Sequence, residues 1–218
     1  MMAGMSALAM LSGCRPGADG LPKPTVRPVQ GNYQPLPAWP QTGPADHSQT
    51  PAGPTAWTPT AGADDHDRWR GILIHHSATP DGNAAELNRL HQIRTDQNGE
   101  RWLGLGYDFV IDNGRGGPDG GVEVGFRWTQ QLQGAHCRPL NCTDNYWNEH
   151  TIGICLVGDF ERHRPTRAQY ESLATLVKFL CRRYGIPEKN ILGHGQVPNA
   201  NTKCPGRYFS WSELRRRL

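Results

Sequence analysis

The sequence predicts an α/β domain in which a mixed central sheet is flanked by one long helix and smaller helices, preceded by a disordered tether. Three observations lead to this fold class. Short apolar runs typical of buried strands recur after residue 70. Residues 167–184 repeat apolar side chains at helical spacing. Residues 15–66 are dense in Pro, Gly, Thr and Ala, so they cannot bury enough apolar surface to offset chain entropy.

The size and charge of the chain limit what it can be. It has 218 residues, of which 36% are hydrophobic and 20% are charged, enough for one ordinary domain and a tail. The net charge is only +3, and no run of Lys and Arg is interleaved with aromatic residues. We therefore expect no nucleic-acid partner. The basic cluster at residues 215–217 is typical of a solvated helix end. We expect the protein to be a monomer.

The N-terminus predicts a membrane anchor. Residues 5–14 form an apolar run that is too short to span a bilayer and ends in small residues and Cys14. Residues 11–14 resemble the bacterial lipobox, whose cysteine is acylated. No Lys or Arg precedes the run, which leaves open an upstream start codon or a spurious signal. Arg15, where an aspartate would favour the inner membrane, predicts a periplasmic lipoprotein anchored in the outer membrane through Cys14.

These features divide the chain into three parts. We expect a lipoprotein-type signal segment over residues 1–14, a flexible Pro/Gly-rich tether over residues 15–66 and the folded domain over residues 67–218. The alternative for the tether is a segment wrapped on the surface of the domain. Trp39 and Trp57 would then be its docking points.

The folded domain opens with a strand and a helix. Residues 71–77 form a compact apolar run, β-branched at two positions, that indicates a buried strand. A polar start at residues 81–83 predicts a helix over residues 83–94. Its shared face would carry Leu87, Leu90, His91 and Arg94.

A hairpin is expected next. Residues 106–112 predict a strand on which Tyr107, Phe109 and Ile111 point to one side. The Gly-rich residues 113–121 form a turn or loop, and residues 121–125 complete an antiparallel pair.

The second half of the domain predicts the centre of the sheet and the long helix. An irregular loop covers residues 134–148, and the most apolar run, residues 151–158, is the expected central strand. The long helix follows over residues 167–184. The remaining elements are a short strand over residues 191–193 and a terminal helix over residues 210–218, with Ser210 as a candidate N-cap.

Candidate metal ligands lie at two places. His75 and His76 end the first strand, a rigid position of the kind that a metal site needs. His194 and Cys204 lie ten residues apart in an irregular loop. Imidazole and thiolate ligands together favour zinc. The residues alone do not separate His75 from His76, and they do not show whether a fourth position is open.

The five other cysteines are assigned by their positions. Cys14 is the lipidation candidate. Cys137 and Cys142 lie five positions apart in one loop, and outside the cytosol we expect them to form a local disulfide. Cys155 and Cys181 lie on the apolar faces of a strand and a helix, where inert core thiols are expected.

Residues 69–209 resemble the zinc-dependent N-acetylmuramoyl-L-alanine amidases of the type shared by phage amidase lysozymes and peptidoglycan recognition proteins. No single motif would suffice, but the motifs occur in family order over the whole domain. They are Ile74 to Thr79, Gly106 to Phe109, Gly134 to His136, Trp147-Asn148 with Thr151 to Ile154, Gly193 to Gly195, and Thr202 to Gly206.

The resemblance implies a zinc site and its chemistry. Its zinc ligands fall on His75, His194 and Cys204, and three protein ligands leave one position open, as in a catalytic zinc. Cysteine at the third position agrees with the phage and recognition-protein branch. Tyr107 and Thr202 fall on residues that stabilise the oxyanion of the reaction. Lys203 is left out because it should point away.

Other positions match less well. His136 and Asn148 correspond to residues beside the cleft, where the resemblance implies substrate contacts and the alternative is a role in fixing the loop. Asp108 stands where relatives carry His or Asn, and the insertion over residues 114–121 replaces a shorter turn. Both leave the peptide specificity open.

The expected function is hydrolysis of the amide bond between N-acetylmuramic acid and L-alanine, in polymeric peptidoglycan or in soluble muropeptides. One alternative is a recognition module that binds peptidoglycan without cleaving it. Another is a structural zinc protein on a different fold, which would need His76 or His136 as a fourth ligand.

Overall fold

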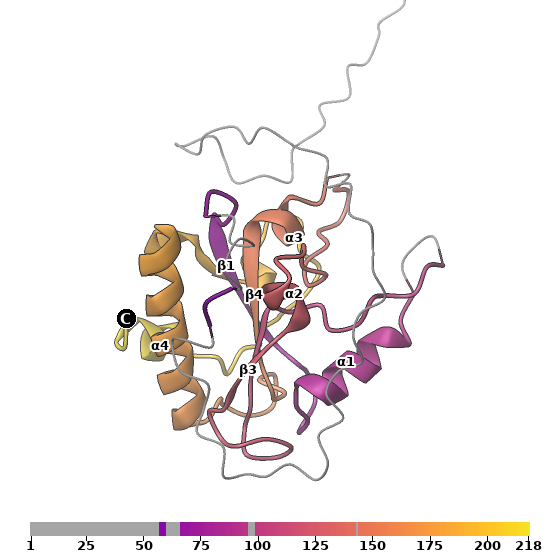
Figure 1. Cartoon of the computed structure of the whole chain (residues 1–218). Helices are drawn as coiled ribbons and strands as arrows, with labels where there is room; N and C mark the ends of the chain where they lie inside the picture. The colour runs from indigo at the N-terminus through magenta and orange to yellow at the C-terminus, as the bar shows by residue number, and fades with distance from the viewer. Residues whose placement is uncertain (1–56, 60–65, 96–98, 143) are drawn as a thin grey trace, which may run out of the picture.

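The computed structural model describes residues 57–59, 66–95, 99–142 and 144–218 (Figure 1). The expected signal segment, Cys14 and most of the expected tether lie outside the described residues. Among the described helices, none is long and apolar enough to cross a membrane.

A five-stranded mixed sheet forms the centre of the domain. Its strand order is β3-β2-β4-β1-β5, and only β3 runs antiparallel to its neighbour. The predicted hairpin is therefore confirmed, and so is the central position of the most apolar strand. The strands are β1 (Gly71–His76), β2 (Phe109–Ile111), β3 (Val122–Val124), β4 (Thr151–Leu156) and β5 (Ile191–Gly193).

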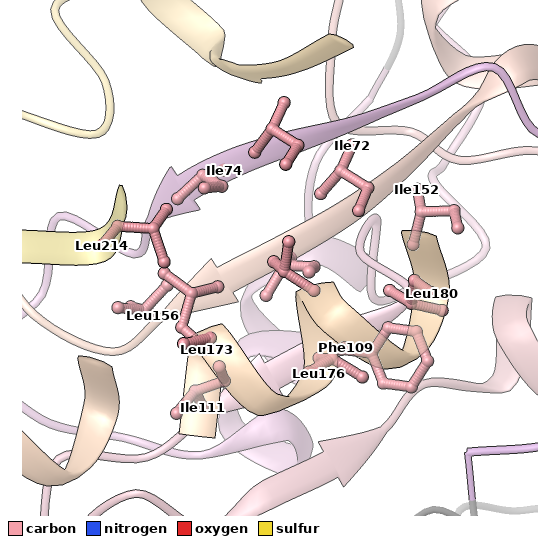
Figure 2. Close-up of a cluster of buried hydrophobic side chains, with 14 of the residues drawn as sticks. Ile72, Ile74, Phe109, Ile111, Ile152, Leu156, Leu173, Leu176, Leu180 and Leu214 are labelled. Atoms are coloured by element: carbon pink, nitrogen blue, oxygen red, sulfur yellow. The ribbon is translucent and has the colours of Figure 1, made fainter. Parts of the chain in front are cut away.

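The main core lies between one face of the sheet and the long helix α4 (Arg167–Tyr184), whose bounds are the predicted ones. Thr166 and Gln169 form a capping box at its start, and Gly185 ends it in a left-handed conformation with φ of 65°. Figure 2 shows the helix side chains facing the strand side chains. The helix contributes Leu173, Leu176 and Leu180, and the strands contribute Ile72, Ile74, Phe109, Ile111, Ile152 and Leu156.

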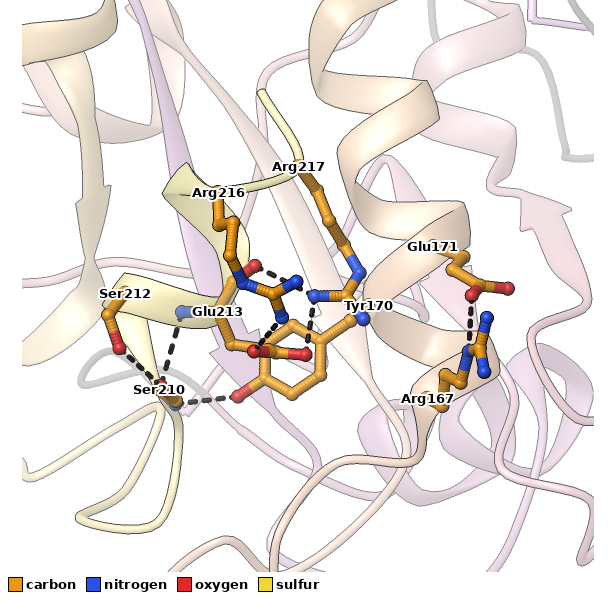
Figure 3. Close-up of polar contacts among 8 residues, drawn as sticks. All are labelled: Arg167, Tyr170, Glu171, Ser210, Ser212, Glu213, Arg216 and Arg217. Atoms are coloured by element: carbon orange, nitrogen blue, oxygen red, sulfur yellow. Dashed lines mark hydrogen bonds and ion pairs between the residues drawn. The ribbon is translucent and has the colours of Figure 1, made fainter.

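The C-terminal helix α5 (Trp211–Arg215) closes one end of this core with Leu214. Ser210 is its N-cap, as predicted, and accepts a hydrogen bond from the Glu213 amide. The amide of Ser210 donates to the Tyr170 hydroxyl at 2.6 Å (Figure 3). Glu213 pairs with Arg216 and Arg217. The basic residues at this end are therefore partly neutralised within the helix, in agreement with a solvated helix end.

The opposite face of the sheet is covered by short helices, and Figure 1 shows α4 and α1 on opposite sides. Helix α1 (Ala84–Gln92) has Asn83 as its N-cap, and it is slightly shorter than predicted. Helices α2 (Phe126–Thr129) and α3 (Tyr146–His150) have four and five residues, and the sequence patterns missed both. The 3₁₀ helices are η1 (Glu188–Asn190) and η2 (His194–Gln196).

Tyr107 departs from the predicted strand pattern. Strand β2 begins only at Phe109, so the alternation of side chains does not extend back to Tyr107. Phe109 and Ile111 lie in the α4 core, whereas Tyr107 packs with Val110 on the opposite face. The expected shared side of these residues is therefore wrong for Tyr107, which faces the same side of the sheet as α1.

Trp57 lies inside the segment predicted to be a tether, yet it belongs to the main core. Its side chain is 3% exposed and meets the Phe179 ring edge-on, with the ring centroids 5.6 Å apart. Its carbonyl accepts a hydrogen bond of 2.8 Å from the Trp128 indole. At Trp57 the structure supports the alternative of a segment docked on the domain. Trp39 lies outside the described residues.

Candidate metal centre

Three candidate ligands come together on the sheet face opposite α4. In β1 the side chains alternate, so Ile72 and Ile74 enter the α4 core while Leu73 and His75 face the other way. Strand β5 pairs with β1, and His194 follows β5 directly, which brings it beside His75. The two imidazole ring centroids lie 4.8 Å apart.

Cys204 reaches the same place because its loop folds back onto η2. The Gly195 amide donates to the Cys204 carbonyl at 2.6 Å. A Cβ atom on Gly195 would lie 2.6 Å from the Thr202 carbonyl oxygen, so only glycine allows this close approach. The return of the loop therefore depends on a glycine next to one ligand.

The spacing of the ligand atoms fits a tetrahedral zinc ion. The nitrogen and sulfur atoms of His75, His194 and Cys204 all lie within 4.8 Å of one another. The Cys204 Sγ atom is 3.7 Å from His75 Nδ1. Tetrahedral bonds of ordinary Zn–S and Zn–N length place two such atoms about 3.6 Å apart. Two imidazoles and one thiol at this spacing form a donor set suited to zinc.

Burial keeps the two imidazoles neutral. It lowers the pKa of His75 well below the usual range, with further contributions from His136, His194 and His76. It lowers the pKa of His194 to about 4, helped by His76. A neutral imidazole retains the lone pair that a metal ion needs.

The thiol of Cys204 is held protonated by burial in the metal-free protein. Burial raises its pKa to about 12, although the His76 backbone amide donates to Sγ at 3.4 Å and opposes this shift. A metal ion bound here would displace the thiol proton.

The structure separates His75 from His76. His76 alternates to the other face, where its Nδ1 accepts a hydrogen bond of 3.1 Å from the Phe160 amide. It contributes its backbone amide to Cys204 and not its ring. Among the described residues, neither His76 nor His136 belongs to the three-residue ligand group. A fourth protein ligand of the kind that a structural zinc would need is not found there.

His136 lies next to His75, and Asn148 is bonded to the backbone of His136; each is 7% exposed. The His136 Nδ1 atom is 3.1 Å from His75 Nε2. The Asn148 Oδ1 atom accepts from the amides of His136 and Cys137, and its Nδ2 donates to Asn145. Both ends of the Asn148 amide are thus used within the protein. For Asn148 the geometry supports the alternative of a loop-fixing role.

Each of the two expected oxyanion partners contacts one candidate ligand. The Tyr107 ring lies 5.1 Å from the His75 ring, measured between centroids. Burial raises the pKa of Tyr107 well above its usual range, so the phenol stays protonated. Thr202 is exposed, and its Oγ1 accepts a hydrogen bond of 3.1 Å from the Cys204 amide. The hydroxyl proton of Thr202 is not used in that bond, so Thr202 can donate it to an incoming oxygen.

Two buried polar residues of α1 hold the loop that carries Tyr107. Asn88 Oδ1 accepts from the Leu105 amide at 2.8 Å, and His91 Nδ1 accepts from the Gly106 amide at 3.0 Å. The helical spacing predicted His91 on the same face as Leu87, but it indicated no role for the imidazole. Polar residues on an inward helix face were the available signal, because buried polar groups need partners.

The predicted disulfide between Cys137 and Cys142 is not formed. Cys137 is a free thiol, buried in an apolar cluster with Leu73, Trp147 and Val197. Burial raises its pKa to about 12. Its packing beneath the site explains the difference, since sequence spacing alone does not show which way a loop cysteine faces. Cys155 is a buried free thiol, as expected, whereas Cys181 is a free thiol that is only partly buried.

Comparisons with known proteins identify the family of the chain. Residues 65–207 match the family described as N-acetylmuramoyl-L-alanine amidase. Peptidoglycan-recognition protein SC2 of Drosophila melanogaster is 32% identical over 149 residues, which cover 66% of this chain and 71% of the relative. The endolysin of Escherichia phage T7 is 30% identical over 153 residues, which cover 66% of this chain and 87% of the endolysin.

A solved structure shows the same fold. The N-acetylmuramoyl-L-alanine amidase LysC from Clostridium intestinale aligns with a TM-score of 0.55 and 25% identity, over 70% of this chain and 87% of that one. The matched residues 65–207 make up more than half of the sequence and include all three candidate ligands. The chain therefore belongs to the N-acetylmuramoyl-L-alanine amidase family.

Proposed function

We propose that this protein hydrolyses the amide bond between N-acetylmuramic acid and L-alanine, using zinc held by His75, His194 and Cys204. The observation that carries the proposal is the convergence of two neutral imidazoles and one thiol at tetrahedral spacing. Among the described residues the group has three members, which leaves one coordination position for chemistry.

The zinc ion, when bound, would supply an activated water and a Lewis acid for the scissile carbonyl. The protein's own groups supply the rest. The Tyr107 phenol stays protonated and lies beside His75, so it can donate to the oxygen that gains negative charge. The Thr202 hydroxyl, oriented by the Cys204 amide, can donate from the loop side. The stem peptide would leave with L-alanine at its new amino terminus.

The relatives favour an amidase over a purely binding protein. The aligned Clostridium structure is itself an amidase by name, whereas the Drosophila relatives are named for recognition. A recognition module would bind peptidoglycan without cleaving it. A protein that cleaves the amide bond needs the complete ligand group and Tyr107. A protein that only binds peptidoglycan does not need them.

The test is product analysis with the purified full chain. Peptidoglycan sacculi and soluble muropeptides are incubated in parallel with the zinc-loaded and the chelator-treated protein. We expect release of stem peptides that begin with L-alanine, without new reducing ends, only from the zinc-loaded protein. Re-addition of zinc should restore release. Binding to sacculi without any peptide release would instead establish the recognition module. The two substrates also show whether the protein acts on polymeric wall or on soluble fragments.

The expected location is part of this proposal. A lipid anchor on Cys14 and a tether would hold the enzyme beside periplasmic peptidoglycan. Metabolic labelling of the expressed protein with a fatty-acid analogue tests it, and a Cys14→Ser variant should lose the label.

A further inference from the structure

Three groups lie in a row behind the metal centre. His75 Nε2 is 3.1 Å from His136 Nδ1, and His136 Nε2 is 3.2 Å from the Thr151 carbonyl oxygen. His75 Nδ1 faces the other way, 3.7 Å from Cys204 Sγ. The ring of His75 is thus bonded to the protein on one side and directed toward the candidate ligands on the other.

The direction of these hydrogen bonds follows from the last group in the row. A carbonyl oxygen can only accept, so His136 Nε2 must carry the proton that points to Thr151. The His136 residue is 7% exposed, and its ring contacts another imidazole and a carbonyl oxygen. Neither contact is acidic, and burying an unpaired imidazolium is costly, so the ring is neutral and has one N–H group. His136 Nδ1 is therefore an acceptor, and the hydrogen at the contact must belong to His75 Nε2.

The ring of His136 has little freedom to turn. A Cβ atom added to Gly134 or Gly153 would lie 2.4 Å or 2.6 Å from His136 Cδ2, so the ring occupies a slot that two glycines leave open. The backbone amide of His136 is bonded to Asn148. Side chain and backbone are both held, which is expected of a residue that orients another.

We propose that His136 is a positioning residue that holds His75 in the tautomer with its proton on Nε2, so that the Nδ1 lone pair faces the metal. The use of that lone pair rests on the proposed zinc function, but the tautomer itself is a property of the metal-free protein. Residues that bond to the second nitrogen of a metal-binding histidine commonly set its tautomer and raise its affinity.

Nuclear magnetic resonance on the metal-free full chain tests the tautomer directly. Two-bond ¹H–¹⁵N correlation spectra at pH 7 distinguish a protonated from an unprotonated ring nitrogen. The His75 signals are identified by their loss in a His75→Gln variant. We expect a protonated Nε2 and an unprotonated Nδ1. A protonated Nδ1, or rapid exchange between the two tautomers, would overturn the proposal. This measurement needs neither zinc nor a substituted His136.

Zinc affinity tests the consequence. The dissociation constant is measured by competition with a chromogenic chelator. His136→Leu removes the acceptor and should weaken zinc binding roughly 10- to 100-fold. His136→Asn can place its Oδ1 near the position of Nδ1 and should stay within a few-fold of the unsubstituted protein. His150→Leu is the matched control, because His150 bonds to the Arg68 carbonyl and does not contact the ligands.

The outcomes separate this proposal from the proposed function. Equal zinc affinity of the Leu and unsubstituted proteins would contradict the role of His136 while leaving zinc catalysis intact. Failure of the unsubstituted protein to bind zinc would contradict the proposed function, and the spectrum of His75 would still decide the tautomer. If His136→Leu does not fold, the spectrum of the unsubstituted protein still tests the tautomer of His75.

Discussion

At the scale of single residues, Cys204 has a thiol whose ionised form is unfavourable where it is buried, unless a metal ion binds it. Its thiol is 7% exposed, and burial raises its pKa to about 12, so a thiolate there requires a neighbouring cation. We expect Cys204→Ser to lose tight zinc binding. The loss of zinc affinity should exceed the roughly 100-fold that follows removal of a residue hydrogen-bonded to a ligand. The measurement is metal stoichiometry after dialysis against a weak chelator.

Cys181→Ser is the control for this prediction, because Cys181 is a free thiol of α4 on the far face of the sheet. It should retain one zinc ion per chain. Full metal occupancy of the Cys204→Ser protein would show that Cys204 is not a ligand.

Tyr107 leads to the second residue-scale prediction. Its hydroxyl is the group that we assign to the oxyanion, whereas its ring packs against His75 and His91. Tyr107→Phe keeps the ring and should keep the zinc ion, but amide hydrolysis should fall roughly 100- to 1000-fold. Turnover and metal content are measured on the same preparation.

Tyr208→Phe, at an exposed tyrosine, is the matched control and should leave the rate unchanged. A Tyr107→Phe protein that cleaves at nearly the normal rate would exclude Tyr107 from the reaction.

The site was predictable where a residue type defines its chemistry, and unpredictable where orientation decides. Thiol and imidazole groups indicated zinc, but the residues alone could not separate His75 from His76. The structure does so through the alternation of β1, which turns only His75 toward Cys204. The predicted disulfide of Cys137 was wrong for the same reason, because the spacing of Cys137 from Cys142 does not show that Cys137 is buried. Side-chain direction depends on what packs on each face, and that is a tertiary property.

At the scale of elements, a pair of carboxyl groups, one of them buried, joins the hairpin to α1. Glu123 of β3 accepts a hydrogen bond of 2.6 Å from the Ala84 amide at the start of α1. Asp112 follows β2, is 1% exposed and is hydrogen-bonded to Glu123. Burial and the neighbouring Glu123 raise the pKa of Asp112 to about 9. Asp112 therefore keeps its proton at neutral pH, in the hydrogen bond to Glu123.

This proton makes stability depend on pH. An unfolded aspartate has a pKa of about 4. Because the folded value is higher, the folded protein keeps a proton that the unfolded chain releases, and stability falls as pH rises between these values. Asp112→Asn replaces this O–H with an amide N–H. We expect it to raise the melting temperature at pH 8 by roughly 2–4 °C for each kcal/mol gained, and to flatten the decline between pH 5 and pH 9.

Asp81→Asn, at an exposed position, provides the comparison and should leave the pH profile of melting unchanged. Thermal unfolding followed by circular dichroism at several pH values measures all three proteins. A decline of equal slope in Asp112→Asn and the unsubstituted protein would refute the retained proton on Asp112.

The elements that the sequence predicted are those with a strong local period. Helix α4 has 18 residues, a capping box and a terminal glycine, and its bounds were predicted to the residue. Helices α2 and α3 have four and five residues. Helices this short are not stable by local propensity, so they exist because tertiary contacts hold them. The strand predicted to contain Tyr107 was too long, because the chain joins the sheet as β2 only at Phe109.

At the scale of the whole molecule, the candidate metal centre joins distant parts of the chain. His75 lies in the first strand, whereas His194 and Cys204 lie in the last loop. Strands β1 and β5 are neighbours in the sheet, which makes the centre possible before any metal binds. The binding site is therefore largely formed by the fold. Zinc binding to the folded domain should raise its free energy of unfolding by mass action.

The segment before the domain is also part of the whole fold, through Trp57. Its ring is 3% exposed and packs on Phe179, and its indole nitrogen is buried with no hydrogen-bond partner among the described residues. Trp57→Ala in the full chain should lose roughly 3 kcal/mol of the free energy of unfolding. Trp57→Phe should cost much less, because it keeps an aromatic ring there and gives up no hydrogen bond. Ile93→Ala, at a side chain that is 73% exposed, controls for loss of a surface apolar group. Urea unfolding measures all four proteins. If Trp57→Ala is as stable as Ile93→Ala, then Trp57 does not hold the segment to the domain, and the folded unit begins where the sequence placed it, near residue 67.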